Sequence, residues 1–139
     1  MNQRLLCYID GASRGNPGPA AVGIVIFAGT SADGDPVVAW GAGLGQATNN
    51  MAEYQALLSA LGKALDLGAR LVTVRSDSEL LVRQMNGQYR VKQPHLRVLY
   101  AQAKQLEASF TQVAYEHIPR TENGRADLLA NQVLDGRIG

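Results

Sequence analysis

The stretch that decides the fold is Arg4–Asp10, which reads RLLCYID, an apolar run closed by one acid. An apolar run this short, without helical spacing, predicts a buried β-strand. An acid at the end of a buried strand costs free energy unless a partner group lies close to it. The same combination returns at Leu71–Asp77, which reads LVTVRSD. Since open α/β sheets bind ligands at the carboxyl ends of their strands, neighbouring strands of this kind would bring Asp10 and Asp77 together.

Two more acids stand in unusual surroundings. Glu53 begins a helix-like segment, and Asp127 interrupts an apolar helical stripe. Several converging acids are tolerated best around a hard divalent cation. Four carboxylates without a His or Cys partner favour Mg²⁺ or Mn²⁺. Two such ions can clamp the attacking and leaving oxygens of a phosphoryl displacement, so the acids predict metal-dependent cleavage of a phosphodiester.

The rest of the chain supplies a sheet and helices around these acids. Strands are expected at 4–10, Ala20–Ala28 and near Val37–Leu44, with a turn over Gly11–Pro19, which together predict an antiparallel meander. Further strands are expected at 70–76 and Thr111–Ile118, and helices at Met51–Leu67, Ser78–Asn86, Pro94 to about Ser109, and Glu122–Leu134. This order predicts an α/β fold with one mixed sheet and helices on its faces, in a single domain over residues 1–139.

Composition narrows the class of protein. The chain has 139 residues, of which 46% are hydrophobic and 18% charged, as in an ordinary globular domain. No apolar stretch approaches a membrane span and no leader is recognisable, so a cytoplasmic location is expected. Cys7 is the only cysteine, which excludes an internal disulfide. The net charge is +1, and the second half of the chain is the more basic, which permits a polyanionic partner.

Each acid also has a simpler interpretation. Asn50–Glu53 resembles a capping box, so Glu53 could satisfy backbone N–H groups. Asp77 could cap the next helix, and Asp10 before Gly11 could initiate a turn. Asp127 has no such alternative, because Asp between Ala126 and Leu128 is a poor helix former in a position that needs no cap.

The local sequences around the acids resemble the type 1 ribonuclease H family over essentially the whole chain. Four ordered motifs carry the resemblance: Tyr8–Pro19, Thr48–Glu53, Ser76–Ser78 and Glu122–Asn131. The resemblance implies a five-stranded mixed sheet, in which two parallel strands follow three antiparallel ones. It also implies hydrolysis of the RNA strand of RNA–DNA hybrids, with 5′-phosphate and 3′-hydroxyl ends. It further implies two Mg²⁺ ions, replaceable by Mn²⁺, held by Asp10, Glu53, Asp77 and Asp127.

The resemblance also suggests substrate contacts. Backbone groups of Gly11, Ala12 and Ser13 are expected to meet the 2′-hydroxyls that distinguish RNA from DNA. The amides of Asn16, Asn49 and Asn50 can donate and accept for the same purpose, and Thr48 is expected to contact a phosphate. The alternatives are a turn at Asn16 and helix capping at Asn49 or Asn50.

The chain departs from many relatives in two places. Ser78 is followed by Glu79 instead of Gln, and the segment between Asn86 and Pro94 lacks the longer basic protrusion of some relatives. The positive charge that binds the hybrid would then come from Arg90, Lys92 and Arg97. Binding is expected to be weaker and more sensitive to salt than in relatives with the protrusion.

Two residues compete for an assisting role in catalysis. Many relatives carry a mobile His before the last acid, and His117 has a suitable spacing. The pair Pro119-Arg120 resembles a branch in which Arg substitutes, and Arg120 is favoured.

The leading hypothesis is a monomeric hybrid-specific endoribonuclease without membrane association. The alternatives are a related metal nuclease that cuts double-stranded RNA or DNA, and a hybrid-binding module that has lost catalysis.

Overall fold

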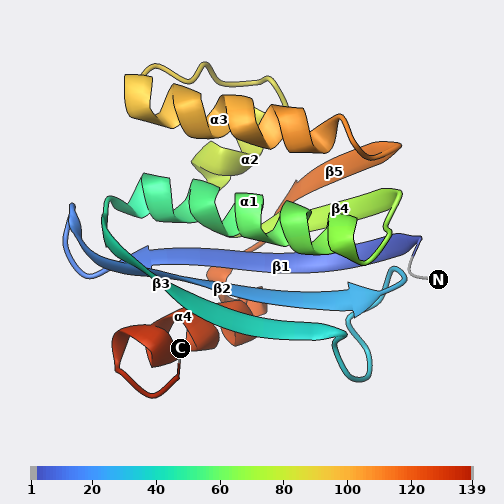
Figure 1. Cartoon of the computed structure of the whole chain (residues 1–139), viewed down its shortest axis with the longest axis horizontal. Coiled ribbons are helices and arrows are strands. Elements are labelled where there is room, and N and C mark those ends of the chain that lie inside the picture. The colour runs from blue at the N-terminus through green and yellow to red at the C-terminus, as the bar shows by residue number, and fades with distance from the viewer. Residues whose placement is uncertain (1–2, 139) are drawn as a thin grey trace.

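The computed structural model describes residues 3–138 and contains one five-stranded sheet with helices on both faces (Figure 1). The strands are β1 (Arg4–Ser13), β2 (Gly18–Ala28), β3 (Val38–Ala47), β4 (Leu71–Ser76) and β5 (Gln112–His117). The helices are α1 (Asn49–Asp66), α2 (Glu79–Met85), α3 (Pro94–Glu107) and α4 (Gly124–Leu134), and a 3₁₀ turn at Arg120–Glu122 precedes α4. The predicted domain also includes Met1, Asn2 and Gly139, which lie outside the described residues.

The sheet has the order β3-β2-β1-β4-β5. The β1–β2 and β2–β3 pairs are antiparallel, whereas β4 and β5 join β1 as parallel strands. This confirms the predicted mixed sheet and places β1 at its centre. β1 and β4 therefore run side by side with their carboxyl ends at the same edge.

β1 is covered on both faces, which explains why its sequence is a nearly continuous apolar run. On one face, Leu5, Cys7 and Ile9 pack with β2 and α1 in the main core. On the other face, Leu6 belongs to a small separate cluster with Val25, Phe27 and Ala126 of α4. In Figure 1, α1, α2 and α3 lie on one side of the sheet and α4 lies alone on the other.

The structure corrects several predicted boundaries. β2 begins at Gly18 and not at Ala20, and α4 begins at Gly124, since Glu122 ends the preceding 3₁₀ turn. β1 does not end at Asp10 but continues to Ser13, because the small residues after Asp10 pair with Ala20–Val22 of β2. The expected turn over Gly11–Pro19 is therefore shorter. β3 runs to Ala47 instead of Leu44, past a register shift in its pairing with β2. α1 begins at Asn49, two residues before the predicted Met51.

No helix within residues 3–138 is long and apolar enough to cross a membrane.

Candidate active site

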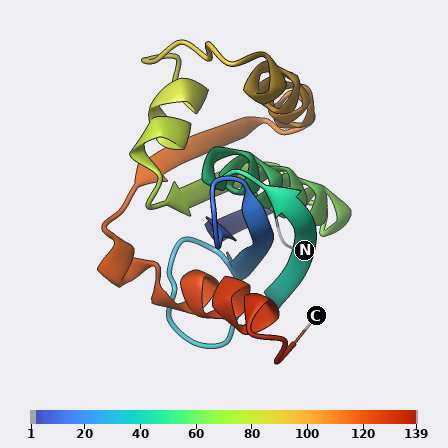
Figure 2. The same ribbon diagram turned by 90° about the vertical axis from the view of Figure 1, so that its left-hand side faces the viewer.

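Three carboxylates converge at the carboxyl ends of the central strands. Asp10 lies in β1, Glu53 in α1, and Asp77 directly after β4. One carboxylate oxygen from each lies within 4.8 Å of the other two. Asp10 and Glu53 are only 5% and 4% exposed, whereas Asp77 is half-buried. Figure 2 looks onto this end of the molecule, where α1 lies on one side of the β1–β2 hairpin and α4 on the other.

Gly11 brings Glu53 to Asp10. A Cβ atom at Gly11 would lie 2.2 Å from the backbone of Ala52, so only glycine lets α1 approach β1 this closely. The Gly11 N–H donates a hydrogen bond of 2.6 Å to Glu53 Oε1. The capping interpretation of Glu53 is wrong, because the Thr48 hydroxyl caps α1 by accepting from the Met51 N–H.

The simpler interpretations of the two strand acids are also wrong. Ser78, not Asp77, caps α2, since its hydroxyl accepts from the Leu81 N–H at 3.2 Å. Asp77 Oδ2 instead accepts from Asn123 Nδ2 at 3.2 Å. Asp10 forms no turn, because it lies inside β1 opposite Gly23.

Asp127 reaches the cluster from the other face of the sheet. Gly23 makes this possible: a Cβ atom there would lie 2.0 Å from the Ala126 carbonyl oxygen, so α4 rests directly on β2 beside Asp10. Asp127 Oδ1 accepts from Asn131 Nδ2 at 3.2 Å and from Arg120 Nη2 at 3.4 Å. Asp127 is close enough to act on the pKa of Asp10, although the tightest grouping contains only the other three acids.

The surroundings of Asp10 and Glu53 disfavour the charged forms of both carboxyls. Burial raises the pKa of the Asp10 carboxyl to about 8, and the charges of Asp77 and Asp127 act in the same direction. Burial and the Asp10 charge raise the pKa of Glu53 well above its usual value, against the opposing effect of the Gly11 N–H. Arg120 offsets part of this repulsion at both carboxyls.

These side chains fit a divalent metal ion. Oδ2 of Asp10 is buried without a hydrogen-bond partner, which is costly for a carboxylate in protein surroundings. All the donors are oxygen atoms, which hard cations such as Mg²⁺ prefer. A cation among them would supply the missing partner and relieve the repulsion that raises the pKa values.

The residues predicted to contact substrate gather at the start of α1. Asn16 Oδ1 accepts from the Asn49 N–H at 3.1 Å, so Asn16 ties the hairpin to α1 and does more than form a turn. The Ser13 hydroxyl donates to the Ala47 carbonyl at 2.7 Å. Because Thr48 caps the helix, the capping interpretation of Asn49 and Asn50 is wrong. Asn49 is exposed and Asn50 half-buried, so both residues are at least partly accessible to a ligand.

A groove of about 460 Å³ continues from this surface. It is lined by Asn50 and by residues of the α2–α3 loop, among them Tyr89, Arg90 and Lys92. Arg97 lies further along, and its Nε donates to the Val91 carbonyl at 3.0 Å. The groove therefore joins the predicted substrate residues of α1 to the basic residues of the loop.

The two candidates for an assisting role lie in different elements. His117 is the last residue of β5 and is exposed. Arg120 lies in the 3₁₀ turn with Nη2 at 3.4 Å from Asp127.

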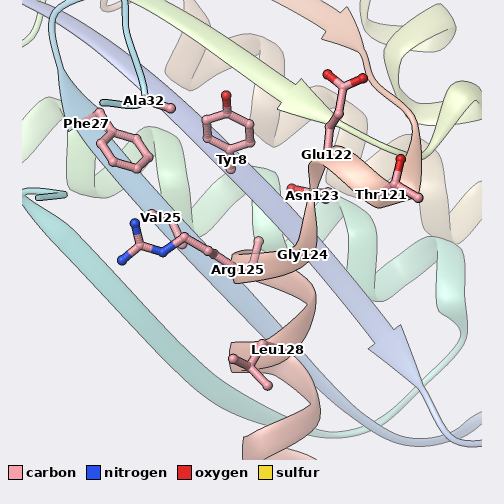
Figure 3. A pocket seen from close by; sticks show the side chains of 11 residues that line it. Tyr8, Val25, Phe27, Ala32, Thr121, Glu122, Asn123, Gly124, Arg125 and Leu128 are labelled. Carbon is pink, nitrogen blue, oxygen red and sulfur yellow. The ribbon is translucent and has the colours of Figure 1, made fainter. Parts of the chain in front are cut away.

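Asn123 was not recognised as a site residue from the sequence. It is 1% exposed, and it stands where the chain enters α4 (Figure 3). Beside it is a hollow of about 430 Å³ lined by Tyr8, Phe27 and Arg125, among others. The available signal was an Asn directly before a helix, which ordinarily indicates a cap.

Comparison with known proteins gives a consistent result. A family model described as "Reverse transcriptase-like" matches residues 8–133. The chain is 46% identical over 132 residues to a protein of Halobacterium salinarum called "Ribonuclease HI", covering 95% of this chain and 65% of that protein. It is also 46% identical to "Bifunctional protein Rv2228c" of Mycobacterium tuberculosis, covering 95% of this chain and 36% of that protein. The chain thus spans less than two thirds of these relatives.

Solved structures agree with the fold. The crystal structure of RNase H1 from Halobacterium salinarum matches with a TM-score of 0.89 at 46% identity, covering 96% of this chain and 98% of that one. The crystal structure of LC11-RNase H1 in complex with RNA/DNA hybrid matches with a TM-score of 0.87 at 41% identity, covering 95% and 97%.

Proposed function

The chain belongs to the type 1 ribonuclease H family, and from this we propose that it is a metal-dependent endoribonuclease that hydrolyses the RNA strand of RNA–DNA hybrids. The observation that carries the proposal is the convergence of Asp10, Glu53 and Asp77, with one carboxylate oxygen left buried and unpaired. A similar structure, LC11-RNase H1, was solved with an RNA/DNA hybrid, which supports the same class of substrate here.

The four acids would hold two Mg²⁺ ions, with Mn²⁺ as a substitute. When bound, the ions would lower the pKa of the attacking water and stabilise the leaving 3′-oxygen, which leaves 5′-phosphate and 3′-hydroxyl ends. The protein prepares this site before any ligand arrives. Gly11 fixes the Glu53 carboxylate, and the close approach of α4 at Gly23 fixes the distance between Asp127 and Asp10.

Selection of the RNA strand is assigned to the start of α1 and the hairpin. The backbone of Gly11–Ser13 and the amides of Asn16, Asn49 and Asn50 would contact 2′-hydroxyls. Thr48 already accepts one bond as the helix cap, and its hydroxyl can still donate to a phosphate oxygen. Arg90 and Lys92 in the groove would hold the backbone of the second strand.

Arg120 is assigned an assisting role. It is exposed, it lies beside Asp127, and it offsets negative charge at Asp10 and Glu53. A flexible cation in this place can stabilise charge that develops on the scissile phosphate. His117 lies on β5, and within residues 3–138 no hydrogen bond or ion pair joins its side chain to the acids.

The test is cleavage of three matched substrates, an RNA–DNA hybrid, an RNA duplex and a DNA duplex, in Mg²⁺ and in Mn²⁺. We expect cleavage of the RNA strand of the hybrid alone, with 5′-phosphate ends, and no cleavage after addition of a chelator. Equal rates on the RNA duplex would support the broader nuclease, and binding without cleavage would support a non-catalytic module. The monomeric state, the single domain and the cytoplasmic location remain predictions.

A further inference from the structure

Asn123 connects two strands at the carboxylate cluster. Its Nδ2 donates a 2.8 Å hydrogen bond to the carbonyl oxygen of Ile9, the residue before Asp10 in β1. The same nitrogen donates to Asp77 Oδ2, directly after β4, at 3.2 Å. β1 and β4 are parallel neighbours, with Ile9 opposite Ser76. One side chain therefore binds both strands at the point where each presents an acid.

The main chain of Asn123 reaches a third acid. Its carbonyl oxygen accepts from the Asp127 N–H at 3.1 Å, which is the first hydrogen bond along α4. Asn123 thus contacts Asp77 directly, holds the backbone next to Asp10, and anchors the turn of helix that carries Asp127. These contacts bring together elements that lie 114 positions apart along the chain.

The ordinary role of an Asn in this position does not account for its geometry. Asn123 is the N-cap residue of α4, yet its side chain makes no capping hydrogen bond. It is turned into the protein, where the side chain is almost wholly buried and Oδ1 has no partner. Both neighbours of Nδ2 are acceptors, so only the amide nitrogen can face them. A buried polar group costs free energy unless it is hydrogen-bonded, and only the Nδ2 half of this amide is bonded.

We propose that Asn123 is a positioning residue that sets the relative places of Asp77, Asp10 and Asp127, and so determines how tightly the cluster binds a divalent metal ion. This inference rests on the proposed function, because it takes the four acids as the metal ligands. Groups that orient metal ligands through hydrogen bonds commonly change metal affinity by about 10–100-fold when they are removed.

The experiment measures Mn²⁺ binding by calorimetry without nucleic acid. Asn123→Ala should weaken Mn²⁺ binding by about 10–100-fold while the protein stays folded. The matched control is Gln84→Ala. Gln84 is also a buried amide that links separate segments, since it accepts from the Tyr54 hydroxyl and donates to the Arg90 carbonyl, but it contacts none of the acids. Its loss should lower the melting temperature and leave Mn²⁺ affinity within about twofold of wild type.

A double variant tests whether Asn123 acts through Asp77. If it does, Asn123→Ala should weaken Mn²⁺ binding much less in an Asp77→Asn background than in the wild type. Equal fold-changes in both backgrounds would overturn the direct connection. The proposal also fails if Asn123→Ala binds Mn²⁺ as wild type does, or if both Ala variants lose affinity alike, since general loosening would then explain the effect.

A measurement on the wild type covers the case in which Asn123→Ala does not fold. The side-chain amide resonance of Asn123 should be protected from solvent exchange and should shift when Mg²⁺ is added. If the Asn123 resonance does not shift at Mg²⁺ concentrations that shift the Asp77 resonances, the proposal is overturned. Absence of metal binding by the wild type itself would instead remove the proposed function, and the two failures are therefore distinguishable.

Discussion

Asp10 carries its carboxylate in surroundings that oppose its charge. The side chain is buried, one oxygen has no partner, and three further acids lie nearby. Such a group favours metal binding but weakens the fold when no metal is present. The carboxylate of Asp10 is therefore favourable for activity and unfavourable for the stability of the metal-free protein.

Asp10→Asn should abolish cleavage and stabilise the metal-free protein. Since folding raises the pKa of Asp10 to about 8, the stability this carboxyl contributes is present at acidic pH and is lost as pH rises toward 8. In a chelator, the wild type should melt at a lower temperature at pH 8 than at pH 5.5, and Asp10→Asn should reduce that difference. A gain of about 1 kcal/mol corresponds to roughly 3–5 °C for a chain of this length.

The control for this measurement is Asp33→Asn, which removes an exposed acid from the β2–β3 loop and should change neither the activity nor the pH trend. Near wild-type turnover by Asp10→Asn would contradict its assignment as a metal ligand.

Asn50 allows substrate contact to be tested apart from helix capping, because the cap of α1 is Thr48. Asn50→Ala should lower the rate of hybrid cleavage at limiting substrate by about tenfold, with a melting temperature within about 1 °C of wild type, because Thr48 supplies the cap. Thr48→Ala should lower stability by about 1 kcal/mol. Melting curves and cleavage rates of the two variants test this, and a collapse of stability in Asn50→Ala would show that the amide supports the helix.

At the scale of elements, two glycines decide how near the helices come to the sheet. Gly11 seats α1 on one face of the sheet, and Gly23 seats α4 on the other. Because Glu53 and Asp127 lie on these helices, the close approach at the two glycines sets the width of the acid cluster, and the Gly11 N–H also binds Glu53 directly.

Gly23→Ala should therefore damage activity through packing alone. The new Cβ would meet the Ala126 carbonyl, and α4 would have to move away from β2 at a cost of about 1–3 kcal/mol. We expect cleavage to fall by more than tenfold, because Asp127 moves with the helix. The matched control is Gly62→Ala, at a helical position with open space around it, which should gain about 0.5–1 kcal/mol and keep full activity. Full activity in Gly23→Ala would contradict this account of the site.

The sequence predicted the elements better than their ends. Periodicity is a local property, so the strands and helices were recognisable. Gly11, Ala12 and Ser13 look like a turn, yet they extend β1 because β2 offers small residues opposite them. The four acids were found because each contradicts its immediate surroundings. Asn123 was missed because its role depends on Ile9 and Asp77, which no local pattern connects to it.

At the scale of the whole molecule, the groove that Asn50 of α1 lines is also lined by the α2–α3 loop. Few cations line this groove, with Arg90 and Lys92 the principal ones. Affinity for a hybrid should thus depend less on ionic attraction than in a protein with an extended basic arm. This reverses the expectation from the sequence that binding would be more sensitive to salt, because fewer phosphate contacts release fewer counterions.

Hybrid affinity measured in Ca²⁺ at several salt concentrations tests this view. Each phosphate contact contributes a slope of about −0.9 in log affinity against log salt, so we expect a total slope of roughly −2 to −4. Arg90→Ala or Lys92→Ala should each flatten it by about one unit. Arg70→Ala is the control, because Arg70 precedes β4 and lies at the opposite end of that strand from Asp77. A slope steeper than about −6, unchanged by either groove variant, would place the binding track elsewhere.

The helices on the two faces of the sheet are packed against cores of different size, and this should affect how the protein unfolds on heating. α4 rests on the small cluster of Leu6, Val25 and Phe27, whereas α1 belongs to the main core. Segments with little buried apolar surface open first, so α4 should detach before the rest of the protein melts. We expect its amides to exchange with deuterium faster than those of α1, and enzymatic activity to fade several degrees below the melting temperature. Detachment of α4 would then inactivate the protein reversibly. The rest of the fold would stay intact, and activity would return on cooling.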